Sequence, residues 1–503
     1  MAAGLFRLRV DWDGDDLFGH AQADITSKVW QLRTRYGRDH GSTLKGRSVG
    51  GTLNATLYNP DGLFSSFKTT SPLFGLILPR RKVQFQMRVS ALDAWTDMWT
   101  GFLITVVPEV AIKSLPRAQL SAFGSLGILN ADDARVGPQA NILTGAAVTE
   151  VLDSASWPAG MRDIDTGQLT MVRWPRSRAD TKALFALRKI DDSEIGFTRE
   201  NKSGHVVWED RHRRLKAPHL TVQATYTDEG ATIRYRDISQ ADPFENVFKV
   251  FRASVTEYSV GATAVLWSVA GDLSIGPGAT VEVWAEYPRE DSPVEAVGVD
   301  NWVTPVASTD YEFNSQADGL GTDLTGNIAI VASKFTEAMK LSITNNASAT
   351  AHKIILQARG DSLNQDSTQS VTAEVAGSPV ESEWPSPAEY LPTLNEGVDH
   401  VKYLRAVHGT VSPILTIAYL ANASQAFLED ARDREVSDRV TVKSDAGTDL
   451  GIDEDHFIEA ISYDLDRHGR LLVGMELSSL RNVAPFWVLG KSRLGIETRL
   501  NYK

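Results

Sequence analysis

Residues 51–62 read GTLNATLYNPDG, a run that alternates apolar and polar side chains and then ends in a turn. A period of two is typical of a half-buried strand, because successive side chains point to opposite faces of a sheet. Pro60 presets the backbone for a reversal and Asp61-Gly62 closes it. Four more segments alternate in the same way: Phe6–Trp12, Val29–Tyr36, Val83–Val89 and Met98–Val107. Residues 1–125 are therefore predicted to form a small barrel or sandwich.

Helical spacing replaces this alternation further along the chain. An apolar stripe predicts a helix over Thr144–Ser156, and Trp157-Pro158 ends it. A second stripe, at Leu184, Leu187 and Ile190, predicts a helix over Thr181–Asp191. A β-hairpin that ends in Val206-Val207-Trp208 follows. Residues 130–215 are therefore predicted to be a compact α+β unit.

Strands return in the second half of the chain. Residues 220–287 read as strands, and residues 288–375 read as an antiparallel sandwich punctuated by glycine and asparagine turns. A helix is predicted over residues 394–410. The tail from residue 411 is again rich in strands, with Arg467-His468-Gly469-Arg470 as a hairpin turn.

Composition excludes several classes of protein. The chain has 503 residues and no cysteine, which excludes disulfides, thiol catalysis and cysteine-ligated metals. Its length suggests roughly three or four domains. No apolar run approaches ~18 residues, so no membrane-spanning helix is expected. The first residues lack the apolar core of a signal peptide.

Charge is unevenly distributed along the chain. The net charge is −13, which argues against a nucleic-acid binder that acts through bulk charge. Residues 1–130 hold 15 basic and 10 acidic side chains, whereas the remainder carries a net charge of −18. The two parts are therefore expected to face different surroundings.

Three groups of polar side chains could carry chemistry, and each also has a structural interpretation. The acidic run Asp11, Asp13, Asp15 and Asp16 fits either a hard cation or an acidic surface loop. The run Asp453–His456 fits either a metal or a polar loop before a strand. His205, Glu209, Asp210 and His212 stand among arginines that suggest a solvated hairpin end. No phosphate-binding loop, nucleophile elbow or zinc-protease motif is present, and no cofactor is expected.

A basic cluster in the first unit is the stronger electrostatic feature. It could be a solvated strand face with long side chains lying along apolar surface, or a contact surface for an acidic partner protein. Its members are Lys28, Arg33, Arg35, Arg38, Lys45, Arg47, Arg80, Arg81 and Lys82.

The order of these features resembles that of tail-tip hub proteins (baseplate hub or minor tail proteins) of tailed bacteriophages. The resemblance begins at Asp24–Val29 and Gln31–Arg38, and it continues through Tyr58–Ser65 and Trp99–Phe102. Later pieces are Thr309-Asp310-Tyr311, Leu356–Gly360, Glu435–Val442 and Phe486–Lys491. Each piece is weak alone, and their order over most of the chain carries the resemblance.

The resemblance implies a mainly β fold with α+β: two small hub β-barrels, an α+β module and an inserted immunoglobulin-like β-sandwich. The implied domains are a first hub barrel at 1–128, an α+β hub module at 129–218 and a β-rich hub section at 219–287. The sandwich would occupy 288–375, and a C-terminal section with the second barrel would occupy 376–503.

The implied function is that of a structural virion protein and not of an enzyme. A homotrimer would form a ring that closes the tail tube around the DNA-ejection channel. Expected partners are the distal tail protein or tail tube, the C-terminus of the tape measure protein, and tail fibres or receptor-binding proteins. Genomic DNA would pass through an acidic lumen without specific binding, and the host envelope would be reached indirectly.

Two alternatives remain open from the sequence. One is a glycan-degrading tail protein, in which distant carboxylates would supply the acid and the base. The other is a carbohydrate-binding or receptor-binding adhesin, since 12 tryptophans and 12 tyrosines allow sugar-stacking platforms. Trp302 is the first candidate for such a platform.

Overall fold

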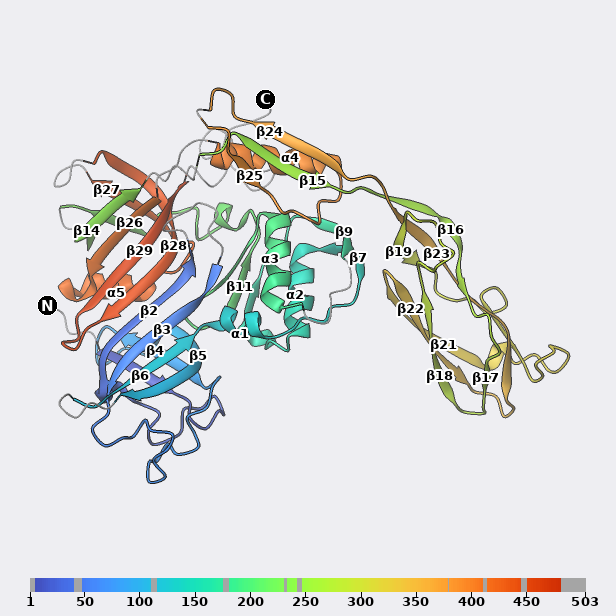
Figure 1. The fold of residues 1–503 in the computed structure, drawn as a ribbon, viewed down its shortest axis with the longest axis horizontal. Coiled ribbons are helices and arrows are strands. Elements are labelled where there is room, and N and C mark those ends of the chain that lie inside the picture. Colours follow the sequence, from blue (N-terminus) through green and yellow to red (C-terminus); the bar gives the residue numbers. More distant parts are fainter. Residues whose placement is uncertain are drawn as a thin grey trace.

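The computed structural model describes residues 5–39, 48–109, 115–174, 181–229, 233–241, 247–378, 380–409, 414–444 and 450–480. Figure 1 shows a broad body from which one module projects as an arm. The prediction of a mainly β protein with an α+β module and a sandwich is confirmed. The barrels differ from the prediction, because no sheet among the described strands closes on itself. None of the described helices is long and apolar enough to span a membrane.

The first β unit contains six strands in the order β1-β4-β5-β6-β3-β2. Alternation is visible in β6, where Ala118, Leu120 and Ala122 are buried and their neighbours are not. The turn predicted after β3 is present, with Gly62 at a positive φ of 66°. The elements are β1 (Leu5–Val10), the 3₁₀ turn η1 (Thr26–Lys28), β2 (Val29–Arg38), β3 (Ser48–Tyr58), β4 (Lys82–Arg88), β5 (Thr96–Glu109) and β6 (Arg117–Phe123).

The C-terminal β unit combines strands from the end of the chain with three from its middle. Strand β29 pairs with both β28 and β26, and the predicted hairpin turn at Gly469 joins β28 to β29. The helix α5 was not predicted. The elements are β12 (Ala224–Thr227), β13 (Ile233–Arg234), β14 (Asp237–Ala241), β26 (Ile414–Leu420), η6 (Ala421–Ala423), α5 (Gln425–Asp433), β27 (Arg439–Ser444), β28 (Ile452–Leu465) and β29 (Leu471–Ser479).

These two β units are fused rather than separate. Strand β2 pairs antiparallel with β28, from Leu32 opposite Leu465 to Gly37 opposite Ala460, so that one 13-stranded sheet runs through both units. Gly37 has φ +116°, and a Cβ there would lie 2.3 Å from the Glu459 carbonyl oxygen, so only glycine fits this close approach. One hydrophobic core extends from β1 to β29.

The α+β module packs its helices on a small core of its own. Helix α2 buries Ala147, Val148, Val151 and Leu152, which confirms the predicted stripe. The predicted hairpin of β10 and β11 is also present. The elements are α1 (Ser125–Ala131), β7 (Gln139–Leu143), α2 (Thr144–Ser154), η2 (Ala159–Met161), β8 (Arg162–Ile164), β9 (Thr170–Trp174), α3 (Ala183–Glu194), β10 (Phe197–Glu200), β11 (Val206–Glu209) and η3 (Arg213–Leu215).

A link of three strands and one helix leads from the body to the arm (Figure 1). The predicted helix at 394–410 is present as α4, and it packs closely on the strands, since a Cβ at Gly397 would lie 2.3 Å from Val255. The link consists of β15 (Val250–Val255), β24 (Gln369–Glu374), β25 (Glu383–Pro385) and α4 (Leu394–His408).

The arm is the predicted sandwich, with sheets of five and three strands around one core. It starts at Tyr258 rather than at residue 288, because β16 pairs with β23 along most of its length. Its elements are β16 (Tyr258–Ser268), β17 (Ser274–Ile275), β18 (Thr280–Glu286), β19 (Ala296–Trp302), β20 (Tyr311–Asn314), η5 (Thr325–Asn327), β21 (Ile328–Phe335), β22 (Ala338–Asn345) and β23 (Ala351–Gln365).

Candidate functional site

The candidate metal sites resolve into structural contacts. Asp11 is buried, and its carboxylate accepts hydrogen bonds from the backbone N–H groups of Gly14 (3.0 Å) and Asp16 (2.9 Å), so it organises the predicted loop. Asp16 in turn pairs with Lys82. Among the described residues, no group of three or more histidine or acidic side chains is placed to hold a metal ion.

The run Asp453–His456 lies inside β28 and not in a loop before a strand, so that interpretation is wrong. Asp453 pairs with Lys443 at 3.1 Å and Asp455 pairs with Arg439 at 2.7 Å, both across the β27–β28 ladder. Alternate residues point the same way along a strand, so these two carboxylates lie on one face and pair with two cations of the neighbouring strand.

The arginines after His205 are not a solvated hairpin end, which corrects a second interpretation. Arg211 pairs with Glu194 at 3.0 Å, and Arg214 pairs with Glu459 at 2.6 Å. Both acidic partners are buried. The sequence places these arginines near each other but does not reveal their acidic partners, since Glu459 lies in the C-terminal β unit, far along the chain.

The basic cluster on β2 faces acidic residues of the same chain. Arg33 bonds Asp464 at 2.9 Å, because β2 pairs with β28 in this register. Arg35 reaches past β28 to Glu476 of β29, at 2.8 Å. The other described members of this strand region also have acidic neighbours, with Lys28 near Asp61 (3.5 Å) and Arg38 near Glu459 (3.4 Å). Lys45 and Arg47 lie outside the described residues.

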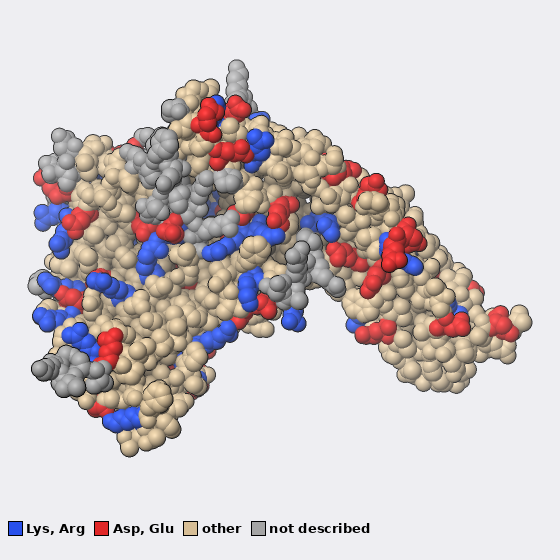
Figure 2. Space-filling model, viewed as in Figure 1, with Lys and Arg blue, Asp and Glu red and all other residues tan. Residues whose placement is uncertain are grey.

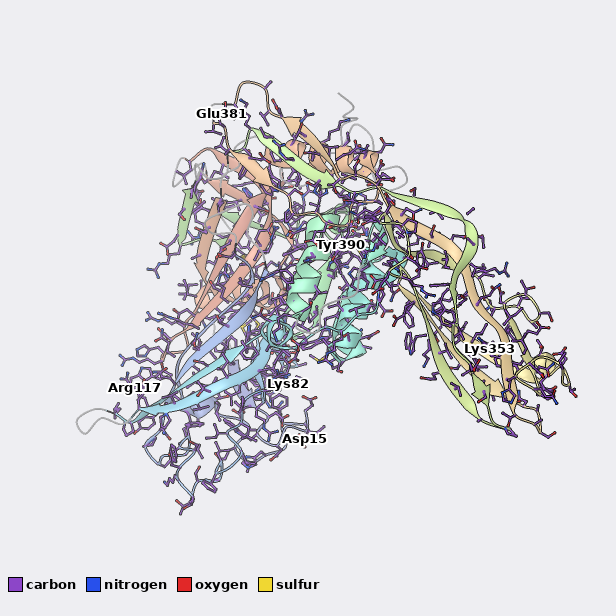
Figure 3. The ribbon with its side chains drawn as sticks, turned by 45° about the vertical axis from the view of Figure 1, so that its right-hand side comes forward. Asp15, Lys82, Arg117, Lys353, Glu381 and Tyr390 are labelled. Atoms are coloured by element: carbon purple, nitrogen blue, oxygen red, sulfur yellow. The ribbon has the colours of Figure 1, made fainter. Side chains whose placement is uncertain are left out.

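The second basic stretch lies at one end of the first β unit. Figure 3 labels Lys82 and Asp15 at this end. Lys82 pairs with Asp16 at 3.2 Å, and Arg80 pairs with Asp132 of the α+β module at 2.6 Å. The Arg81 guanidinium covers Gly14. On the face drawn in Figure 2, basic and acidic side chains of the body are interspersed. A role for this cluster in binding a partner stays a prediction.

A buried charged network that the sequence did not reveal lies where three units meet. We call it the junction; its members are Arg199, Glu200, Glu209, Arg214, Glu435, Ser437 and Glu459. The Arg199 Nε donates to Glu209 at 2.8 Å, and the Ser437 hydroxyl donates to the same carboxylate at 2.7 Å. The first contact lies within the hairpin of the α+β module, and the second joins that hairpin to the C-terminal β unit.

Arg214 makes the most complete ion pair of the junction. Both of its terminal nitrogens donate to the Glu459 carboxylate, at 2.6 and 2.9 Å, and the Ser478 hydroxyl donates to it as well. The Glu459 side chain is 1% exposed. Such two-pronged pairs fix both distance and angle, so this contact sets the orientation of η3 on β28.

Glu200 connects the α+β module to the first β unit. Its carboxylate accepts hydrogen bonds from the backbone N–H of Gly51 in β3 (2.6 Å) and of Leu126 in α1 (3.1 Å). A Cβ at Gly51 or at Gly124 would lie 2.1 or 2.0 Å from this carboxylate, so both glycines leave the space that it fills.

Burial and charge act in opposite directions on the junction carboxylates. Burial raises the pKa of Glu200 to about 7, although the hydrogen bonds from Leu126 and Gly51 oppose the rise. Burial would also raise the pKa of Glu209, but the charges of Arg199 and Arg214 bring that pKa below its usual value. Glu209 is therefore held as an anion between cations, whereas Glu200 binds a proton near neutrality.

Trp302, the predicted sugar-stacking residue, is not on the surface. Its side chain is 2% exposed, and its indole N–H donates to the Phe335 carbonyl at 2.7 Å. The prediction is wrong because Trp302 ends β19 on the core side of the sandwich. Phe486–Lys491, which contributed to the family resemblance, lie outside the described residues.

Comparison with solved structures finds similarity to tail proteins. The tail protein from Neisseria meningitidis MC58 matches with a TM-score of 0.50 and 10% identity, over 95% of this chain and 97% of that chain. The 43 kDa tail protein of prophage MuSo2 from Shewanella oneidensis gives 0.49 and 11%, over 96% and 99%. Prophage tail protein gp18 from Listeria monocytogenes EGD-e gives 0.40 and 6%, over 94% of each chain.

No protein-family model matches the sequence, and no curated protein matches it. At 10% identity, the first structural likeness establishes the fold alone, which this chain shares with the tail protein from Neisseria meningitidis MC58. The predicted resemblance is thus confirmed at the level of the fold.

Proposed function

We propose that this chain is a structural hub protein of a phage tail tip, present in the virion. The observation that carries the proposal is the match to a tail protein over nearly the full length of both chains. Fold does not by itself imply function. The proposal therefore assigns a role to each of two features, the fused β units and the projecting sandwich.

Three copies would form a ring that closes the tail tube. A structural ring needs subunits that keep their shape, and the shared core and the junction supply that rigidity. The distal tail protein or tail tube and the tape measure C-terminus would contact the body. DNA would pass through the lumen, and the acidic remainder of the chain would repel its phosphates.

The sandwich would stand on the outside of the ring and anchor fibres or receptor-binding proteins. It projects from the body through the link, so it is free to carry a partner without altering the ring (Figure 1). A map in which the sandwich lines the channel would exclude this role.

We also propose that the chain is not an enzyme. The buried carboxylates of the junction and the α+β module are engaged with arginines or backbone N–H groups. Release of sugars from purified cell-wall or surface glycan, abolished by one carboxylate substitution, would contradict this.

Antibodies against the chain test the location. In negatively stained particles, gold-labelled antibody should mark the tail tip. Label along the fibres, or on the head, would contradict a hub. Native mass spectrometry of tips released from particles should give three copies, and any other copy number would exclude the trimer.

A further inference from the structure

One tryptophan differs from the rest of the described tryptophans in its exposure. Trp284 in β18 is 47% exposed, whereas each of the others in the described part of the chain is buried or half-buried. Large aromatic rings left on a surface mark binding sites more often than chance, because their burial by a ligand is strongly favourable.

Trp284 lies on one face of a sheet, beside a second ring. Strands β18, β22 and β21 make the three-stranded sheet of the sandwich, on the side nearer the body in Figure 1. Ala285 and Met339 are buried in the core, so Trp284 and its cross-strand partner Lys340 belong to the outward face. The Phe335 ring lies 6.0 Å from the indole, with 24° between the planes.

Polar groups extend this face along the strands. Lys340 bonds Glu282 at 2.8 Å, and the hydroxyls of Thr280 and Thr344 lie 2.8 Å apart. Four residues of strand separate Trp284 from Thr280, which is ~13 Å at ~3.3 Å per residue. A ligand that starts on the indole therefore meets one donor and acceptor pair and then two hydroxyls.

We propose that this face binds a saccharide. A pyranose ring has an apolar C–H face that stacks on an indole and hydroxyls that bond carboxylate, ammonium and hydroxyl groups, which are the groups on this face. Glu282 and Glu286 accompany a single lysine on these two strands. The local charge is therefore negative and favours a neutral saccharide over an anionic one.

A competing interpretation assigns the rings to the contact between the sandwich and the α+β module. A Cβ at Gly137 would lie 3.5 Å from Phe335, and the Thr336 N–H bonds the Pro138 carbonyl at 3.1 Å. Under that interpretation Trp284 stabilises the position of the arm and binds no sugar. The proposal does not depend on the hub ring, so a failure of one leaves the other standing.

The test measures binding of N-acetylglucosamine tetramer and of maltotetraose to the purified full chain, by ligand-observed NMR and titration calorimetry. We expect one of the two to bind with a Kd of about 0.1–1 mM. Trp284→Ala should weaken binding at least about tenfold, and Trp284→Phe should retain part of it. Val265→Ala, at an exposed apolar residue of the opposite sheet, is the matched control and should bind normally.

Two results would overturn the proposal. The first is the absence of binding of both sugars up to about 10 mM. The second is binding that Trp284→Ala leaves unchanged or that Val265→Ala weakens equally. If Trp284→Ala lowers the melting temperature, Trp284→Phe and Lys340→Gln replace it, and unchanged binding in both then counts against the site. Saturation by a proline-rich peptide but by neither sugar would assign the face to a protein partner instead.

Discussion

The α+β module contacts the two fused β units on one side and the sandwich on the other, and the two contacts differ in kind. At the junction, arginines and carboxylates of the α+β module and the C-terminal β unit are bonded to each other, and Glu200 accepts the backbone N–H of Gly51 in the first β unit. At the sandwich, the polar contacts between described residues are the pair Arg173–Glu337 (3.2 Å), the bond from Asn141 to Asp300 (2.6 Å) and one backbone bond. The Phe335 ring also lies near Gly137. Buried pairs are geometrically exacting and costly to break, whereas pairs that water reaches contribute less; Arg173 and Glu337 are 21% and 30% exposed.

This difference separates two mechanical roles. The body cannot rearrange at the junction without leaving charges unpaired in its interior, so we expect it to move as one rigid piece. We expect the sandwich to shift more easily, because only a few polar contacts would be lost while the link keeps it attached. A rigid body suits a ring around a channel, and a loosely held arm suits the capture of a partner.

Removing one arginine of the junction should have the largest effect. Arg214→Met leaves Glu459 without its two-pronged partner, and we expect a loss of about 3–5 kcal/mol of unfolding free energy. Urea unfolding of the full chain measures it. Arg33→Met is the control, because Arg33 is 68% exposed in its pair with Asp464, and its loss should be below about 1 kcal/mol. Equal losses would contradict the distinction between buried and exposed pairs.

The pH dependence of stability should depend on Glu200. Its pKa is about 7 in the folded chain against 4.5 for the free side chain, so the folded state binds the extra proton between these values. Below pH 4.5 Glu200 is protonated in both states, and its contribution to stability is complete. As pH rises from 4.5 to 7 the unfolded chain releases this proton while the folded chain still holds it, so the unfolding free energy falls by about 2–3 kcal/mol.

Glu200→Gln tests this by removing the titrating group. In the unsubstituted chain the unfolding free energy should fall from pH 5 to pH 7, and in Glu200→Gln this fall should be smaller by about 2 kcal/mol. Asp191, whose pKa burial also raises to about 6, stays in both proteins and cancels. Identical pH profiles would show that Glu200 does not take up the proton.

The glycine that makes room for Glu200 should also be sensitive. Gly124→Ala places a Cβ about 2.0 Å from the carboxylate, and forcing the two apart should cost about 1–3 kcal/mol. Gly326→Ala is matched, because a Cβ there meets no atom within 4 Å, and its effect should stay within about 0.5 kcal/mol. Thermal unfolding compares the two variants. If Gly124→Ala is as stable as Gly326→Ala, the Glu200 carboxylate can move away at little cost, and the prediction is wrong.

The contacts of the sandwich should have the smallest effect on stability. Arg173→Ala with Asp300→Ala removes both side-chain contacts and should change the unfolding free energy of the body by less than about 0.5 kcal/mol. Small-angle X-ray scattering should nevertheless show a wider spread of arm positions, since two polar contacts are gone. Lower stability with an unchanged scattering profile would reverse the assignment of rigid and movable parts.

Local periodicity predicted the elements and could not predict their partners. The stripes of α2 and α3 and the alternation of β3 follow from neighbouring residues, so they were found. The helix α5 has only nine residues, and it was missed. The first strands of the sandwich were assigned to the body, because alternation shows that a strand has two faces but not which sheet it joins.

The site was harder to predict for the same reason. The basic residues of β2 are visible in the sequence, but Asp464 becomes the neighbour of Arg33 only through the register of β2 and β28. Arg214 and Glu459 are likewise 245 positions apart. Gly51 and Gly124 make room for the Glu200 carboxylate, and the sequence does not reveal this because it does not show that Glu200 lies between them.

A cryo-EM reconstruction of the tail of the intact particle tests the central claim most directly. The account predicts three copies around the axis at the tail tip, with the fused β units in the ring wall and the sandwich outside it. Density for this chain in a side fibre, or a ring whose channel is lined by the sandwich, would contradict it.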